Sequence, residues 1–261
     1  MKSEARTPLL GPGDPAPVRV TNPDGRSSFL LIGDHAGLAI PGALGTLGLT
    51  SQDLSRHIAC DIGVAGLGRR MAAALDACFI EQVYSRLVVD CNRAGNHADA
   101  FWTKSDGTVI PGNLTLTAAE REARHAAIQA PYQAAIAAEL ARRDAAGRTT
   151  ILVSLHSFTP VMDGRARPWD VGILHDGGDA RFAVALRDYL TQAGRFIIGD
   201  NQPYRMDHTD YTVPLHAYDQ RRLYAELEIR QDHLADDSGQ IQWAESLATA
   251  LRMAERAVAE P

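Results

Sequence analysis

The feature that most constrains this chain is the regular alternation of short apolar runs with longer segments of helical periodicity. The runs are β-branched or leucine-rich, are bounded by Gly, Asp or Asn, and cover 28–33, 86–90, 150–155, 171–174, 196–199 and 224–229. Apolar residues recur at three- and four-residue spacing over 61–77, 117–143, 180–193 and 240–259. Strands alternating with helices predict an α/β fold, a three-layer sandwich with helices on both faces of a mixed, mostly parallel sheet.

Local signals refine this outline. Thr117 and Glu120 have the spacing of a capping box at the start of the second helix. Pro131 should kink or split that helix, because proline removes a ladder hydrogen bond. The first residues hold several prolines and glycines without periodicity, so we expect an irregular lead-in over 1–25 and one α/β domain over 26–261.

Charge and cysteine content exclude several classes of protein. The chain has 26 Lys and Arg against 32 Asp and Glu, a net charge of −6, so nucleic acid is not an expected partner. No apolar run approaches the ~18 residues of a membrane span, and the start lacks the apolar core of a secretory signal. Three cysteines without a C-x-x-C pair are typical of a reducing compartment. We therefore expect a cytoplasmic protein that binds neither nucleic acid nor membrane.

Polar side chains gather where the predicted strands end. Those after the first three runs are, in order, Asp34 with His35, then Asp90 with Asn92 and Arg93, then His156. In open α/β sheets, functional groups collect just past the carboxyl ends of the strands. Histidines at two different strand ends, together with carboxylates, favour a metal, and zinc with an open position for water suits this chemistry. Any one of the 9 histidines taken alone is more often a surface or hydrogen-bonded residue.

The last predicted strand carries an unusual set of charges. Period-two alternation places Glu226, Glu228 and Arg230 on one face, and burying that face is costly unless partners neutralise the charges. A carboxylate here could be catalytic or could simply pair with Arg230. For Glu226, the ion pair with Arg230 is the favoured interpretation.

Familiar sequence motifs do not decide the chemistry. The chain contains no H-E-x-x-H, so spacing alone does not establish zinc, and no G-x-S-x-G of a serine hydrolase. It also has no Walker A loop. The glycines of 63–68 lie inside a helical pattern, which favours close helix packing over a phosphate cradle.

Several segments together resemble one family. They are D-H-A-G at 34–37, I-P at 40–41, D-I-G at 61–63, D-C-N-R at 90–93, L-H-S-F-T-P at 155–160, N-Q-P-Y at 201–204 and E-I-R-Q-D at 228–232. From about Leu30 to Asp232 the chain resembles the N-formylglutamate amidohydrolase family, which is similar in fold to the zinc carboxypeptidases.

The resemblance implies a metal site. His35 looks like the first zinc histidine, and His156, followed by Ser and Phe, looks like the second. The carboxypeptidases place a zinc-binding Glu three residues after the first histidine, where this chain has Leu38, which cannot ligate a metal. Asp61 is our candidate for the third ligand. Its alternative is an ordinary aspartate at a helix N-terminus, stabilised by the macrodipole.

The resemblance also implies roles for other residues. Asn92 and Arg93 look like the clamp for the substrate carboxylate, and Arg suits a planar bidentate grip. Glu228 looks like the general base that takes the proton of a metal-activated water and returns it to the leaving amine. Arg230 is a further candidate for substrate binding. His216 could donate to the developing oxyanion, although a loop histidine is as often structural.

The leading hypothesis is a zinc-dependent amidohydrolase that cleaves N-formyl-L-glutamate to formate and L-glutamate, with a role in histidine degradation implied by the resemblance. One alternative is a hydrolase of other N-acyl amino acids or small peptides, since acyl preference depends on pocket shape. Another is a metal-free protein that binds an acidic metabolite. The sequence indicates no oligomeric state.

Overall fold

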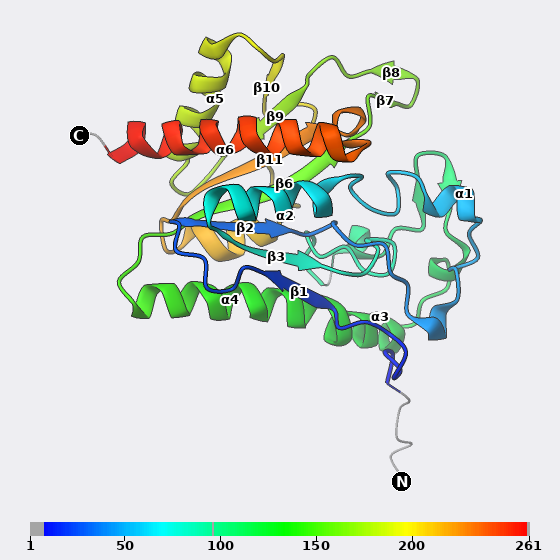
Figure 1. Ribbon diagram of the computed structural model, residues 1–261. Coiled ribbons are helices and arrows are strands. Elements are labelled where there is room, and N and C mark those ends of the chain that lie inside the picture. The colour runs from blue at the N-terminus through cyan, green and yellow to red at the C-terminus, as the bar shows by residue number, and fades with distance from the viewer. Residues whose placement is uncertain (1–7, 96, 260–261) are drawn as a thin grey trace.

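Seven strands form one mixed sheet in the computed structural model, which describes residues 8–95 and 97–259 (Figure 1). The strands are β1 (Val18–Thr21), β2 (Phe29–Gly33), β3 (Cys78–Gln82), β6 (Ile151–Phe158), β9 (Val171–Leu174), β10 (Ile198–Asp200) and β11 (Leu223–Arg230), in the spatial order β1-β3-β2-β6-β11-β9-β10. Strands β3, β2, β6 and β11 run parallel to one another. At the edges, β1 is antiparallel to β3, and the parallel pair β9 and β10 is antiparallel to β11.

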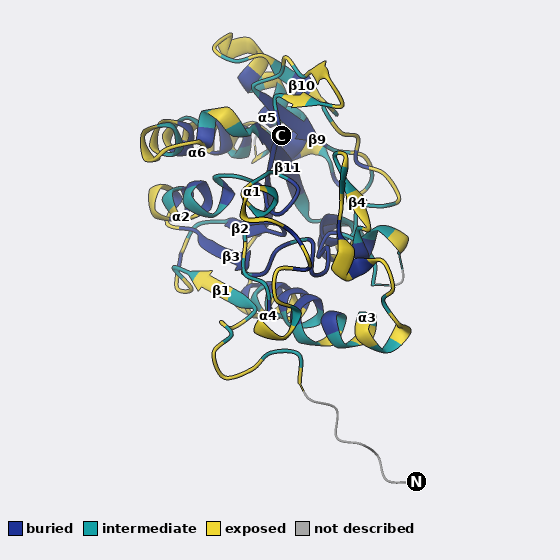
Figure 2. Cartoon of the chain, turned by 90° about the vertical axis from the view of Figure 1, so that its right-hand side faces the viewer, coloured by how far each residue is buried: buried dark blue, intermediate teal, exposed yellow. Residues whose placement is uncertain are grey.

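Helices cover both faces of this sheet. One apolar core joins the sheet to α2 (Val64–Leu75), α5 (Arg181–Ala193) and α6 (Asp237–Ala259), and a second core joins it to α4 (Ala130–Ala145), with α3 (Ala118–Arg124) at the end of α4 (Figure 1). In Figure 2 the strands are mainly buried and the outer turns of the helices exposed. The predicted three-layer α/β sandwich with a mixed, mostly parallel sheet is therefore confirmed.

Smaller elements lie in the connections. They are α1 (Ser51–Leu54), the hairpins β4 (Lys104–Ser105) with β5 (Thr108–Val109) and β7 (Val161–Met162) with β8 (Arg165–Ala166), 3-10 turns at Gly42–Leu44, Ala98–Phe101, Pro111–Asn113 and Gln231–Leu234, and π-helical turns at His125–Gln129 and Pro214–Tyr218. Both hairpins and much of the connecting chain lie at the end of the sheet where the four parallel strands finish (Figure 1).

Most predicted elements coincide with observed ones. The predicted strands 28–33, 150–155, 171–174, 196–199 and 224–229 match β2, β6, β9, β10 and β11. The predicted helices match α2, the continuous run of α3 into α4, α5 and α6. Thr117 and Glu120 form the predicted capping box, each side chain accepting the other residue's backbone N–H. Just before Pro131 the helix adopts a π-helical turn, so the proline alters the helix without ending it.

The predicted strand at 86–90 is wrong. These residues form a turn in which Leu87 N–H donates to Ser85 Oγ, and Leu87 to Val89 are fully buried in the second core. Their apolar character reflects burial, which a buried loop and a buried strand share. The strand in this part of the chain is β3, and part of the lead-in expected to be irregular forms edge strand β1. Residues 1–7 of that lead-in lie outside the described residues.

A close backbone approach shapes the connection after β2. A Cβ on Gly37 would lie 2.0 Å from the Val83 backbone, so this position requires glycine. Ala39 N–H donates to Val83 O and Ser85 N–H donates to Ala39 O, which binds this connection to the one after β3. The residues that follow β2 and β3 are thereby held side by side.

Candidate metal centre

A cavity of about 580 Å³ opens at the carboxyl ends of the parallel strands. Its walls are rich in titratable side chains, among them His35, Asp61, Arg86, Arg93, His156, Asp210, Glu226 and Glu228. These residues come from strands β6 and β11, from the connection between β2 and α2, and from the connections after β3 and β10. This is the position expected of a functional site in an α/β sheet.

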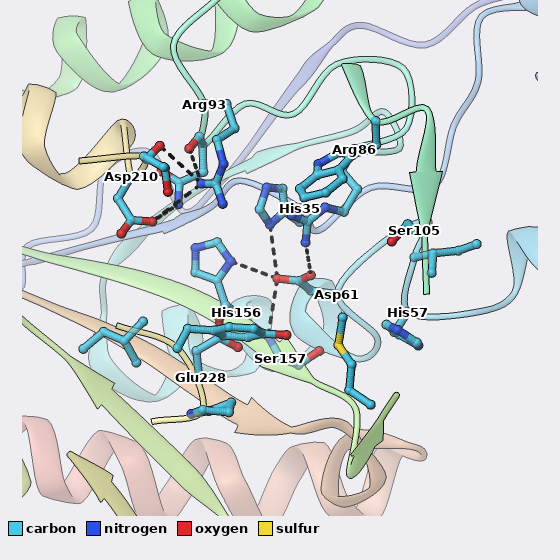
Figure 3. Close-up of a pocket in the computed structure, with 18 of the residues that line it drawn as sticks. His35, His57, Asp61, Arg86, Arg93, Ser105, His156, Ser157, Asp210 and Glu228 are labelled. Atoms are coloured by element: carbon cyan, nitrogen blue, oxygen red, sulfur yellow. Dashed lines mark hydrogen bonds and ion pairs between the residues drawn. The ribbon is translucent and has the colours of Figure 1, made fainter. Parts of the chain in front are cut away.

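Two histidines and one aspartate converge in this cavity (Figure 3). His156 Nδ1 lies 2.9 Å and His35 Nδ1 3.4 Å from the same oxygen, Asp61 Oδ2. All three residues are buried, and one potential ligand atom from each lies within 4.8 Å of the others. Asp61 N–H donates to His35 O at 2.9 Å, which fixes the aspartate beside the first histidine. The exposed Leu38 does not line the cavity.

Neighbouring side chains fix the orientation of the first histidine. His35 Nε2 lies 2.7 Å from Asp90 Oδ1. Since a carboxylate only accepts hydrogen bonds, the Nε2 proton points to Asp90 and directs Nδ1 toward Asp61. Arg86 joins the two aspartates, with Nη1 3.3 Å from Asp61 Oδ1 and Nη2 2.7 Å from Asp90 Oδ2. Trp102 Nε1–H also donates to Asp90 Oδ2.

The second histidine is held in a similar way. His156 Nε2 lies 3.0 Å from Ser154 Oγ and 3.4 Å from Asp34 Oδ2, and the serine hydroxyl donates to the same aspartate. Thr212 Oγ1–H donates to the other oxygen of Asp34 at 2.6 Å. Both imidazole rings therefore present Nδ1 to Asp61, backed by a carboxylate behind Nε2, an arrangement typical of metal-binding histidines.

The donor set suits a divalent cation. His35 Nδ1 is buried and has no hydrogen-bond partner in the described part of the chain. Burial acts to lower the pKa of both histidines, but the surrounding carboxylates outweigh it and raise both pKa values, while the histidines lower the pKa of Asp61 against its own burial. A bound cation can replace the protons that the two histidines hold beside these carboxylates. Two imidazoles and a carboxylate are a ligand set that zinc accepts with one position open.

Two buried glutamates lie beside these three residues. Glu226 and Glu228 occupy the same face of β11, next to Ser154 and His156 of β6 in the parallel register. Burial raises the pKa of Glu226 to about 8 and that of Glu228 to about 7, and the charges of His156 act against this rise. One carboxylate oxygen of each is buried without a hydrogen-bond partner among the described residues.

Arg230 does not neutralise these glutamates. Its guanidinium lies 2.8 Å from Asp232 and 3.3 Å from Asp170, and it does not line the cavity. The predicted ion pair of Glu226 with Arg230 is therefore absent from the described structure. The last residue of β11 turns away from the cavity, because Asp232 in the turn that follows and Asp170 just before β9 provide close carboxylate partners.

Arg93 lies on the opposite wall from Glu228 (Figure 3), and Asn92 also lines the cavity. Asn92 Oδ1 accepts two backbone N–H groups, from Tyr211 and Thr212. The Arg93 side chain is 17% exposed, and its Nη1 donates to Asn92 O at 2.8 Å. The two side chains predicted to hold a substrate carboxylate thus do face the cavity that contains the histidines.

His216 is not brought to the cavity. Its Nε2 lies 2.8 Å from Gln133 Oε1, and burial lowers its pKa to about 4. It lies in the π-helical turn Pro214–Tyr218 and does not line the cavity. A neutral, hydrogen-bonded imidazole in this position is a structural feature.

Sequence reasoning did not assign a role to Arg86, Asp90, Asp34 or Asp210. Asp34 and Asp90 stand inside the motifs that carry the family resemblance, and their signal was a carboxylate directly after a buried apolar run. Arg86 lies four residues before Asp90. Only the turn at 86–88 shows that this spacing brings both side chains to His35 and Asp61.

Comparison with known families and structures gives the context of this site. The family model described as N-formylglutamate amidohydrolase matches residues 27–235. None of the curated proteins compared with the chain matches it. None of the helices in the described residues combines the length and apolar character that crossing a membrane requires.

Two solved structures are similar over nearly the whole chain. The gene product Atu2144 from Agrobacterium tumefaciens is 36% identical, with a TM-score of 0.93 over 97% of this chain and 100% of that one. The N-formylglutamate amidohydrolase from Ralstonia eutropha is 18% identical, with a TM-score of 0.72 over 92% of this chain and 98% of that one. The second likeness shows that the fold is shared.

Proposed function

This chain belongs to the N-formylglutamate amidohydrolase family, and from that premise we propose that it hydrolyses N-formyl-L-glutamate to formate and L-glutamate with the help of a zinc ion. The observation that carries the proposal is the convergence of His35 Nδ1, His156 Nδ1 and Asp61 Oδ2 at the end of the parallel strands. Asp90 and Asp34 orient the two rings by contacting their Nε2 atoms.

His35, Asp61 and His156 would hold the metal. When bound, zinc supplies Lewis acidity, which lowers the pKa of a water from 15.7 to ~7 and polarises an amide carbonyl. Arg86 keeps Asp61 in place by occupying its Oδ1, so that Oδ2 faces the two histidines.

Glu228 is the proposed general base. It is buried, lines the cavity, and pairs in register with His156, which places its carboxylate beside the predicted ligands. Its elevated pKa of about 7 lies near neutral pH, where a group can both accept and return a proton. Glu228 would take the proton of the attacking water and deliver it to the leaving amine.

Asn92 and Arg93 are proposed to bind the substrate's α-carboxylate. Asn92 lines the cavity, and Arg93 lies across it from Glu228, with the histidines between (Figure 3). A carboxylate held there would position the adjacent amide near the ligands and the base, and such positioning contributes to catalysis by removing orientational freedom before the chemical step. The role in histidine degradation stays a prediction from the family resemblance.

Metal content and formate release together test this proposal. We expect freshly purified or zinc-reconstituted protein to contain about one zinc per chain and to release formate from N-formyl-L-glutamate. His156→Ala should lose both, because it removes one of three ligands. Leu38→Ala serves as the matched control, since Leu38 is exposed and outside the cavity.

The outcomes separate the alternatives. Stoichiometric zinc retained by His156→Ala would remove His156 from the ligand set. No zinc after reconstitution, with binding of N-formyl-L-glutamate retained, would favour the metal-free binding protein. Zinc with cleavage of N-acetyl or other N-acyl amino acids but not of N-formyl-L-glutamate would move the substrate to another acyl class.

A further inference from the structure

The proposed carboxylate clamp already contains a carboxylate from the protein. Asp210 Oδ1 accepts a hydrogen bond from Asn92 Nδ2 at 3.2 Å and lies 3.6 Å from Arg93 Nη1. Figure 3 shows Asp210 beside Arg93, and both residues line the cavity. One oxygen of this aspartate thus meets both groups that would bind a substrate carboxylate.

Arg93 does not need Asp210 to hold its position. Its Nη1 donates to Asn92 O at 2.8 Å and to Thr209 O at 3.4 Å. The Asn92 side chain is anchored as well, because its oxygen accepts two backbone N–H groups. Backbone contacts therefore orient the clamp, and the aspartate contacts both clamp residues while lining the same cavity.

Asp210 is itself held in place by a local turn. Its second oxygen, Oδ2, accepts the Asp207 N–H at 2.8 Å, and Asp210 N–H donates to Asp207 O. The side chain is only 11% exposed. The turn presents the carboxylate to the clamp with one oxygen bound on each side.

We propose that Asp210 is an internal occupant of the Asn92–Arg93 clamp that competes with a ligand carboxylate and so sets the affinity of this site for its substrate. The inference rests on the proposed function in taking Asn92 and Arg93 as the carboxylate-binding groups. Two carboxylates beside one guanidinium repel each other and share its positive charge, so the Asp210 carboxylate, 3.6 Å from Arg93 Nη1, weakens the binding of an incoming carboxylate.

Two substitutions remove the occupant while preserving the turn. Asp210→Asn has a single acceptor oxygen, which cannot serve both the Asp207 N–H and the clamp, and it carries no charge. Asp210→Ser can still accept the Asp207 N–H through its hydroxyl but is too short to fill the clamp. Asp207→Asn is the matched control, because it removes the same charge from the same turn without emptying the clamp.

Binding of glutarate, a dicarboxylate without an amide bond, gives a readout that does not depend on hydrolysis. By titration calorimetry we expect both Asp210 variants to bind glutarate about three- to tenfold more tightly than the parent. Asp207→Asn should change the affinity by less than about twofold, because Asp207 lines the cavity but its side chain is 48% exposed and does not contact either clamp residue among the described residues. In an Arg93→Lys background the gain from Asp210→Asn should shrink, since the two residues share one contact.

Steady-state kinetics extend the test to the substrate. The KM for N-formyl-L-glutamate should fall in Asp210→Asn with little change in kcat, and this fall should vanish for the α-amide of the same compound, which lacks the competing carboxylate. Unchanged or weaker glutarate binding by both folded Asp210 variants would overturn the inference and show that the aspartate supports the clamp. Tighter glutarate binding without any hydrolysis of N-formyl-L-glutamate would retain the inference and reject the proposed substrate.

Discussion

Replacing Glu228 with Gln tests the catalytic base and its energetic cost in one variant. Glutamine keeps the size of the side chain and removes proton acceptance. We expect kcat for formate release to fall by ~10²–10⁴-fold, the usual contribution of general acid–base catalysis. Zinc content should not change, because Glu228 is outside the predicted ligand set.

The same substitution should stabilise the metal-free protein. Burial raises the pKa of Glu228 from 4.5 to about 7, so between these values the folded state binds more protons than the unfolded state, and stability falls as the pH rises. Above about pH 7 the ionised side chain therefore costs about 3 kcal/mol. Removing the charge therefore stabilises the protein by about 3 kcal/mol, but a buried amide without hydrogen-bond partners costs about 1–3 kcal/mol. The expected net gain is about 1 kcal/mol, a rise of roughly 2–4 °C in the thermal midpoint for a chain of this size.

The assay uses one preparation for three measurements: thermal midpoint of the metal-free protein at about pH 8, zinc content after reconstitution, and kcat. Asp232→Asn provides a control, since it removes an acidic group after the same strand, outside the cavity. A kcat within about tenfold of the parent, a difference of only ~1.4 kcal/mol in barrier, would refute the role of Glu228 as the essential base. A lower thermal midpoint would instead show that the carboxylate has a stabilising partner.

Three further predictions concern Arg93, Asp90 and His216. Arg93→Lys keeps the charge but loses the planar fork, so KM for N-formyl-L-glutamate should rise by the equivalent of about 1–3 kcal/mol; an unchanged KM would place the clamp elsewhere. Asp90→Asn weakens the support of His35 Nε2, and zinc affinity measured by chelator competition should drop by about 10–100-fold, whereas equal affinity would show that the 2.7 Å contact does not orient the ring. His216 is buried with a pKa lowered from 6.5 to about 4, so the unfolded state gains a proton first and stability should fall by up to about 3 kcal/mol as pH drops through this window. His216→Gln should flatten that part of the urea-unfolding profile, and an identical profile would assign the pH dependence to other groups.

The sequence predicts a site residue correctly where the strand that carries it can be recognised from its own apolar residues. His35 and His156 follow or end strands whose apolar runs are unambiguous, so the sheet brings them together as the strand-end rule predicts. Asp61 is predicted less directly, from the absence of a ligand at Leu38. The structure places it through a backbone hydrogen bond to His35, a contact between residues 26 positions apart that no periodicity encodes.

Strand β3 shows how tertiary pairing hides a strand from sequence reasoning. Its residues Cys78–Gln82 are all buried, yet two of the five are polar. Glu81 is tolerated because Arg19 and Arg69 meet its carboxylate at 2.8 and 2.6 Å. Those arginines come from β1 and α2, so the pairing that makes a buried strand possible depends on elements the sequence does not link to it.

The connection at 86–93 shows the opposite effect, in which a strand-like pattern conceals a functional loop. Leu87 to Val89 are apolar because the loop passes through the second core. Had they formed a strand, side chains would alternate between faces and Arg86 and Asp90 would share a face. The turn at Ser85 also brings these two together, now as a pair that holds Asp61 and His35. The four-residue spacing therefore predicts correctly that Arg86 and Asp90 lie close together, although the predicted strand is wrong.

The charges around the cavity give an argument for a cation that is independent of the family comparison. Five buried carboxyl groups lie around the two histidines: those of Asp34, Asp61, Asp90, Glu226 and Glu228. Among the described residues, the only guanidinium that bonds to them is that of Arg86. Burial without compensating positive charge is costly. The protein reduces that cost by raising the pKa of both glutamates and both histidines, so that protons supply the missing charge. A divalent cation held by His35, Asp61 and His156 would supply this charge without those protons, which would leave Glu228 free to act as a base.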